Sequence, residues 1–136
     1  MRRALALLAG ALVAAGCGSP AGDLFRVDRS GSGEGAKVTL VVSDDGMVRC
    51  NGGAPKPVGA QRLLQARQLA RDLSTQAALG LELEPGAAQD TTFRYRAELA
   101  DGTISFADSS RGLPPTYTKL AAFTRIVARG PCGLGR

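Results

Sequence analysis

The segment TFRYRAEL, residues 92–99, alternates strictly between polar and apolar side chains. A period of two is typical of a strand with one buried face and one solvated face. Asp101-Gly102 then predicts a tight turn, because glycine tolerates a positive φ. Residues 103–107 return with Ile104 and Phe106 on the buried side. These residues predict an antiparallel hairpin whose outer face is polar.

Three further strands are expected before this hairpin. Phe25 and Val27 alternate with polar neighbours and predict a strand over 23–30, while a valine-rich run predicts a central strand over 37–43. The glycine-rich segment 30–35 joins these two strands. Asp44-Asp45-Gly46 predicts a hairpin turn into a third strand over 47–50.

Two amphipathic helices complete the pattern. After a Gly/Pro-rich loop over 51–57, apolar residues at steps of three and four predict a helix over 58–79, and Gly80 suits its end. Segment 81–89 is expected to be a loop with a short extended piece. A second helix is predicted over 115–129. The apolar stripes are Leu63, Ala66, Leu69, Ala70, Leu73 and Ala77 in the first helix, and Tyr117, Leu120, Phe123, Thr124 and Val127, flanked by Ile126, in the second.

The expected order is strand, strand, strand, helix, strand, strand, helix. An α+β fold, with a mostly antiparallel sheet and two helices packed on one of its faces, buries every apolar stripe. We expect residues 23–136 to form a single domain of this kind.

Composition and charge exclude several classes of function. The 136 residues include 17 basic and 12 acidic side chains, and two of the basic ones, Arg2 and Arg3, lie in an apparent leader. The excess of positive charge is too small, and the basic residues are too evenly spread along the chain, to indicate nucleic-acid binding. The chain has no histidine, which removes the commonest general base and metal ligand. The sequence therefore predicts no cofactor, no metal site and no nucleic-acid partner.

The first 16 residues have the pattern of a signal peptide. Arg2 and Arg3 precede a short apolar run that is too short to span a bilayer, and Val13-Ala14-Ala15-Gly16 leads directly to Cys17. This ending resembles the bacterial lipobox, although Ala14 stands where leucine is usual. The resemblance implies lipidation of Cys17, a short tether over 17–22, and a position on the extracytoplasmic face of the cell membrane. The alternative is an ordinary secretory signal with Cys17 in a disulfide set.

Cys50 and Cys132 remain as an even pair. In an exported protein such a pair predicts a disulfide bond. The alternative, a thiol nucleophile or a metal pair, has no histidine to activate it and no CxxC spacing.

Other polar groups have weaker patterns. A hairpin turn explains Asp44-Asp45 better than a calcium loop does, and solvated surface explains Glu82 and Glu84 better than a catalytic carboxylate pair. Segment 30–35 lacks the Lys-Ser/Thr of a phosphate-binding loop. The serines at 74, 109 and 110 have no neighbouring base. Two basic pairs, Arg67/Arg71 and Arg94/Arg96, face either anionic lipid headgroups or water.

Several short motifs resemble known groups of proteins. The whole chain, with 14 arginines against 3 lysines, looks like small lipoproteins of high-GC bacteria. Residues 25–32 (FRVDRSGS), the Thr92-Phe93-Arg94-Tyr95 strand and the Leu113-Pro114 helix start are similar to the emfourin-like inhibitors of thermolysin-type metalloproteases. Ser32 replaces the second glycine of the family's opening motif, and the resemblance transfers no inhibitory residue.

Two classes of function follow from these patterns. The first is a membrane-anchored, non-enzymatic envelope binding module, with protease inhibition as one form. It would present the loop at Ser30, Gly31, Ser32 and Gly33, or a sheet edge, to a protein partner. The alternative is an enzyme of unrecognised type or a lipoprotein that binds a small ligand. We favour the first, because no nucleophile has a base beside it.

Overall fold

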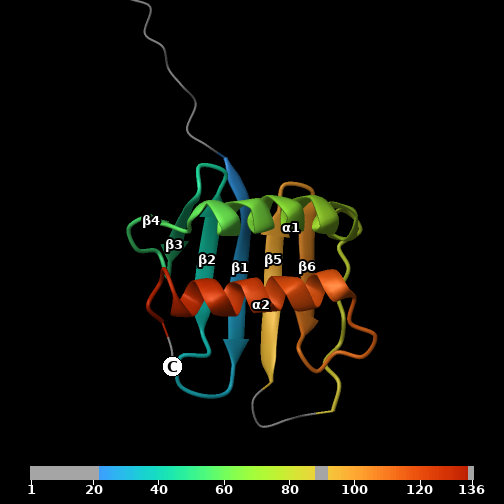
Figure 1. Cartoon of the computed structure of the whole chain (residues 1–136). Coiled ribbons are helices and arrows are strands. Elements are labelled where there is room, and N and C mark those ends of the chain that lie inside the picture. Colours follow the sequence, from blue (N-terminus) through green and yellow to red (C-terminus); the bar gives the residue numbers. More distant parts are fainter. Residues whose placement is uncertain (1–21, 88–91, 135–136) are drawn as a thin grey trace, which may run out of the picture.

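The computed structural model describes residues 22–87 and 92–134, which form a six-stranded antiparallel sheet with two helices. The sheet order is β4-β3-β2-β1-β5-β6. Both helices lie across the same face of the sheet and run in opposite directions (Figure 1). The predicted α+β fold is therefore confirmed. The elements are β1 (Asp23–Gly31), β2 (Val38–Ser43), β3 (Met47–Cys50), β4 (Lys56–Pro57), α1 (Ala60–Ala78), β5 (Phe93–Leu99), β6 (Gly102–Ala107) and α2 (Pro115–Arg129).

The hydrophobic core lies between the sheet and the two helices. Strand β5 alternates as predicted, with buried Tyr95, Ala97 and Leu99 between exposed polar residues. The ring of Phe106 stacks on Tyr95 and contacts Tyr117, with both pairs of centroids 5.0 Å apart, so the β5–β6 hairpin packs directly on α2. The buried stripe residues are Ala66, Leu69, Leu73 and Ala77 in α1, and Tyr117, Leu120, Phe123, Thr124 and Val127 in α2.

The structure differs from the prediction at the ends of several elements. Strand β4 lies within segment 51–57, which the sequence predicts to be a loop. The prediction is wrong at this point because a two-residue strand that contains Pro57 shows no alternation of polar and apolar residues. Helix α1 begins at Ala60 rather than at Val58. The Val58 N–H instead donates to the Gly46 carbonyl at 2.9 Å, which keeps this buried residue with the sheet.

Short segments form both edges of the described sheet. At one edge, β4 pairs with β3, and Pro57 has no N–H to offer a further strand. At the other, the Leu83 N–H donates to the Ser105 carbonyl at 2.8 Å, and the Ser105 N–H donates to the Leu81 carbonyl at 3.1 Å. The extended piece expected within 81–89 is thus a short parallel partner of β6.

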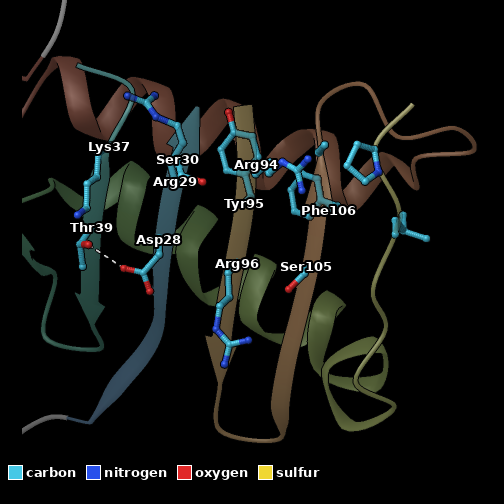
Figure 2. A pocket seen from close by; sticks show the side chains of 13 residues that line it. Asp28, Arg29, Ser30, Lys37, Thr39, Arg94, Tyr95, Arg96, Ser105 and Phe106 are labelled. Atoms are coloured by element: carbon cyan, nitrogen blue, oxygen red, sulfur yellow. Dashed lines mark hydrogen bonds between the residues drawn. The ribbon is translucent and has the colours of Figure 1, made fainter. Parts of the chain in front are cut away.

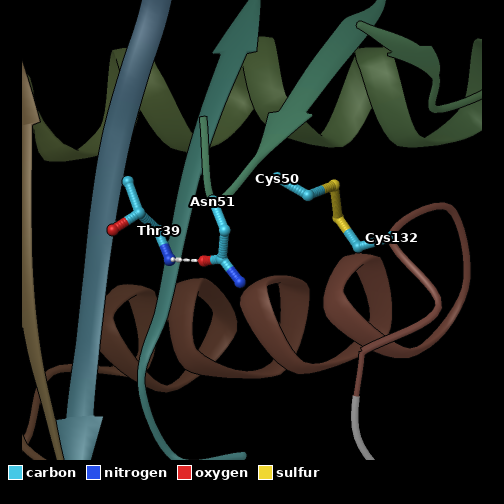
Figure 3. The surroundings of a disulfide bond; sticks show 4 residues. All are labelled: Thr39, Cys50, Asn51 and Cys132. Atoms are coloured by element: carbon cyan, nitrogen blue, oxygen red, sulfur yellow. Dashed lines mark hydrogen bonds between the residues drawn. A yellow bond between two sulfur atoms is a disulfide. The ribbon is translucent and has the colours of Figure 1, made fainter. Parts of the chain in front are cut away.

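The predicted disulfide bond between Cys50 and Cys132 is present (Figure 3). Its Cα atoms are 5.7 Å apart and the two residues are separated by 82 positions. Beside it, the Asn51 carboxamide oxygen accepts from the Thr39 N–H at 2.8 Å. The bond thus fastens the end of β3 to the residues that follow α2.

The predicted leader, residues 1–16, and Cys17 lie outside the described residues, as does the tether up to residue 21. Neither helix in the described part of the chain combines the length and the apolar character that crossing a bilayer requires.

Candidate functional site

The sheet face opposite the helices is covered by no described element and carries a set of polar and charged side chains. Cross-strand pairing arranges these side chains in rows. In one row Asp28 of β1 lies between Thr39 of β2 and Arg96 of β5, and Arg96 in turn faces Ser105 of β6. In the next row Ser30 lies opposite Arg94. We call this surface the open face.

A groove of about 470 Å³ lies on the open face, toward the end of β1 (Figure 2). Its polar lining comes from four neighbouring strands and the residue before β2. The segment beside β6 contributes an apolar wall. The exposed cationic residues are Lys37, Arg94 and Arg96, the hydroxyls are Ser30, Thr39 and Ser105, and the wall residues are Leu83 and Pro85. Arg29 also lines the groove, but its side chain is buried.

Asp28, the one acidic residue among the described residues of the groove, is already paired. Asp28 accepts hydrogen bonds from Arg26 Nε at 3.0 Å and from Thr39 Oγ1 at 2.7 Å. The bond from Arg26 lowers the pKa of Asp28 below its ordinary value, and the Thr39 bond and the charge of Arg96 act in the same direction. Asp28 is therefore a carboxylate at neutral pH.

The three cationic side chains of the groove are not paired in this way. Lys37, Arg94 and Arg96 are exposed, and none of them makes a hydrogen bond or an ion pair with another described residue. Among the described residues, the groove therefore presents three positive charges to solvent and one carboxylate, which is paired with Arg26. Such a surface attracts anionic groups.

Arg29 is a buried charged residue beside the groove that the sequence reasoning missed. It follows Phe25 and Val27 on the core side of β1 and is only 7% exposed. Its Nε and Nη2 donate to the carbonyls of Ala36 and Gly35, both at 2.9 Å, and its guanidinium lies 4.8 Å from the centre of the Phe93 ring. The alternation that places Phe25 and Val27 on the buried side of β1 also places Arg29 there. It therefore predicts a buried guanidinium that needs hydrogen-bond acceptors.

The predicted binding loop is shorter than the sequence suggested. Ser30 and Gly31 belong to β1 and pair with Arg94 and Phe93. A Cβ at Gly31 would lie 2.8 Å from the Thr92 carbonyl oxygen, so the close approach of β5 requires glycine. Ser32 and Gly33 do lie in the loop, which the guanidinium of Arg29 fastens to the sheet at its far end.

The acidic turn at residues 44–46 has a structural role. Asp45 Oδ1 accepts from Ser43 Oγ at 2.5 Å and from the Met47 N–H at 3.2 Å. Asp44 forms an ion pair with Arg67 at 2.6 Å. The hairpin interpretation is confirmed, and across residues 22–87 and 92–134 no three metal-ligating side chains come together.

The remaining candidates are dispersed. Glu82 lies alongside β6 and Glu84 lies in the loop that follows. Ser74 Oγ donates to the Arg71 carbonyl, and Ser110 Oγ accepts from the Ala107 N–H. These groups belong to separate local structures and form no common site with the groove.

The two basic pairs lie at different places on the molecule. Arg67 and Arg71 lie on α1, near the start of β1, and Arg67 is bound to Asp44. Arg94 lies beside Ser30, about 23 Å along β1 from Asp23 at 3.3 Å per residue. The pairs therefore do not form one basic surface.

Comparisons with protein-family models, with curated proteins and with solved structures find no match for this chain. The functional argument therefore rests on the residues of this chain. Its strongest features are the single remaining cysteine, Cys17, and the open face.

Proposed function

We propose that this chain is a lipid-anchored, non-enzymatic binding module on the extracytoplasmic face of a bacterial cell membrane. The observation that carries the anchor is the pairing of Cys50 with Cys132. It accounts for two of the three cysteines and leaves only Cys17, which directly follows the leader-like run. A disulfide between distant residues also agrees with an exported, oxidising location.

The open face supports the binding role. The helices occupy one side of the sheet, and the groove with Lys37, Arg94 and Arg96 lies on the other. If Cys17 sits in the membrane, the short tether enters β1 at Asp23, and the groove lies near the opposite end of that strand. This arrangement directs the groove away from the lipid surface and toward molecules in the envelope.

The non-enzymatic assignment rests on the sequence. Without histidine, a hydroxyl or thiol nucleophile in this chain lacks the commonest base that would activate it. The Cys50 and Cys132 sulfurs are joined to each other and are not free nucleophiles. An enzyme of unrecognised type and a lipoprotein that binds a small ligand remain the alternatives. Turnover of a substrate, abolished by one polar substitution in the groove, would favour the enzyme.

Mass analysis of the membrane fraction tests the anchor. We expect the intact chain to begin at Cys17 and to carry the added mass of diacylglycerol, whose two acyl chains suffice for lasting attachment. Cys17→Ser should lose this mass and leave the membrane. Wild-type protein that is released without lipid would contradict the anchor.

A specific observation favours protease inhibition as a second candidate. Arg29 fastens the far end of the loop that contains Ser32 and Gly33, so the loop is held in place before any partner arrives. Preorganisation of this kind lowers the entropic cost of inserting a loop into a cleft. The expected result is slowed peptide cleavage by a thermolysin-type metalloprotease. Unchanged cleavage at saturating protein would exclude this role for that class.

A further inference from the structure

The three exposed cationic residues of the groove are spread over strand β5 and the residue before β2. Lys37 and Arg94 flank β1 from opposite sides, which separates their backbones by about 10 Å at 4.8 Å per strand. Arg94 and Arg96 project from the same side of β5, about 7 Å apart at 3.4 Å per residue. Several anionic groups in a row match this spread, because each can meet a cation of its own.

Recognition at this place must come from side chains. Strands β1 and β5 are each paired on both sides, so their backbone N–H and C=O groups are already used within the sheet. A ligand therefore cannot join the sheet as an additional strand here. It meets the guanidinium groups, the Lys37 ammonium and the hydroxyls of Ser30, Thr39 and Ser105 instead.

An extended peptide fits this spacing. Residues two positions apart in an extended chain project on the same side with a repeat of about 7 Å, the same as that of Arg94 and Arg96. Carboxylates accept charge-assisted hydrogen bonds from guanidinium groups, often two at a time. We propose that the groove binds an acidic, extended segment of a protein partner, with alternate carboxylates against Arg94 and Arg96 and a further one near Lys37.

The other lining residues agree with such a ligand. Leu83 and Pro85 form an apolar wall at the β6 side, where an apolar side chain of the segment can pack. Among the residues that the structure describes, Asp28 is the only acidic one that lines the groove, and Arg26 and Thr39 hold it. The segment therefore meets one opposing charge there. This inference rests on the proposed binding role and names its ligand class, but it does not require the lipid anchor.

A binding titration tests the inference with the full chain purified in detergent. The probe is a short fluorescent peptide with glutamate at alternate positions. The control peptide has glutamine at those positions. We expect only the glutamate peptide to bind, and more weakly as salt rises and shortens the range of charge interactions. Arg94→Gln and Arg96→Gln should each weaken binding about fivefold, and the double variant about twentyfold.

Two further variants sharpen the test. Arg49→Gln removes an exposed positive charge from the same open face but outside the groove, and it should leave binding unchanged. Asp28→Asn keeps the shape of the side chain and removes the carboxylate that competes with the ligand. It should strengthen binding severalfold, an outcome that damage to the fold would not produce.

Three results would overturn the inference. The first is that the glutamate peptide does not bind. The second is that Arg49→Gln weakens binding as much as the groove variants do. The third is that inorganic phosphate at millimolar concentration displaces the peptide completely, which would indicate a site for a small anion. Failure of this test, with lipid found on Cys17, would leave the anchor intact. Peptide binding to a chain that carries no lipid would refute the anchor and leave the groove assignment intact.

Discussion

At the scale of single residues, Arg29 has the most unusual environment. It is a charged side chain on the apolar side of β1, and its guanidinium is held by the carbonyls of Gly35 and Ala36 and by the ring of Phe93. These bonds give the buried charge its acceptors and close the loop between β1 and β2. The groove residues Ser30 and Lys37 lie directly beside this closure.

Arg29→Met should destabilise the domain by about 1–3 kcal/mol, because it leaves buried carbonyl groups without donors. Urea unfolding followed by circular dichroism measures the change. Arg94→Met is the matched control, since Arg94 is exposed, and should change the stability by less than about 0.5 kcal/mol. Equal losses in the two variants would contradict the role of Arg29 in closing the loop.

The carboxyl of Asp28 should titrate below the usual range for aspartate. The hydrogen bond from Arg26 is the main cause, so Arg26→Gln should raise the pKa of Asp28 toward its ordinary value. The ionised Asp28 therefore stabilises the folded protein at pH values above the ordinary pKa of aspartate. This contribution to the free energy of unfolding is lost as the pH falls through the lower pKa of the folded state. NMR titration of the side-chain carboxyl carbon measures both proteins. An Asp28 pKa that Arg26→Gln leaves unchanged would refute this cause.

At the scale of elements, the disulfide connects the layers of the fold. Cys50 ends β3 and Cys132 follows α2, so the bond fastens the second helix to the sheet. Closing a loop of this length removes entropy from the unfolded chain worth about 4–5 kcal/mol in the chain-entropy model. Replacing both cysteines by alanine should lower the free energy of unfolding by about that amount. A loss below about 1 kcal/mol in urea unfolding would contradict this view.

An element can be predicted from the sequence when its pattern of apolar and polar residues is long enough to show a period. The β5–β6 hairpin and α2 carry several turns or alternations and were predicted closely. Strand β4 and the residues beside β6 are too short for a period, and only their pairing with neighbours defines them. The groove could not be predicted from the sequence either. Lys37, Ser105 and Arg96 are far apart in the chain, and only the order of the strands in the sheet brings them to one groove.

These short edge pairings bear on one functional expectation. A sheet edge is one of the surfaces expected for a partner, and the edges of the described sheet are short segments, one of which contains Pro57. Native proteins use short strands and proline at edges against unwanted strand pairing. We therefore propose the open face, rather than an edge, as the surface for a partner.

At the scale of the whole molecule, the two ends of the sheet differ in charge. Asp23, Asp44 and Asp101 lie around the start of β1 together with Arg71 and with Arg67, which is bound to Asp44. The unpaired cations of the groove lie toward the other end. Because the three aspartates outnumber the two arginines at the start of β1, this end does not favour contact with anionic lipid headgroups. This polarity supports an orientation in which the groove faces away from the membrane.

Photo-crosslinking in cells that express the full chain tests the central claim that the open face of an anchored module binds a protein partner. A photoreactive residue is placed at Ser30 or Ser105, which line the groove without supplying its charges, and at Gln68, exposed on α1, as the control. We predict the same membrane-associated adduct from both groove positions, lost in the Arg94→Gln/Arg96→Gln background, and none from Gln68. An adduct from Gln68 alone, or no adduct from either groove position, would contradict the account.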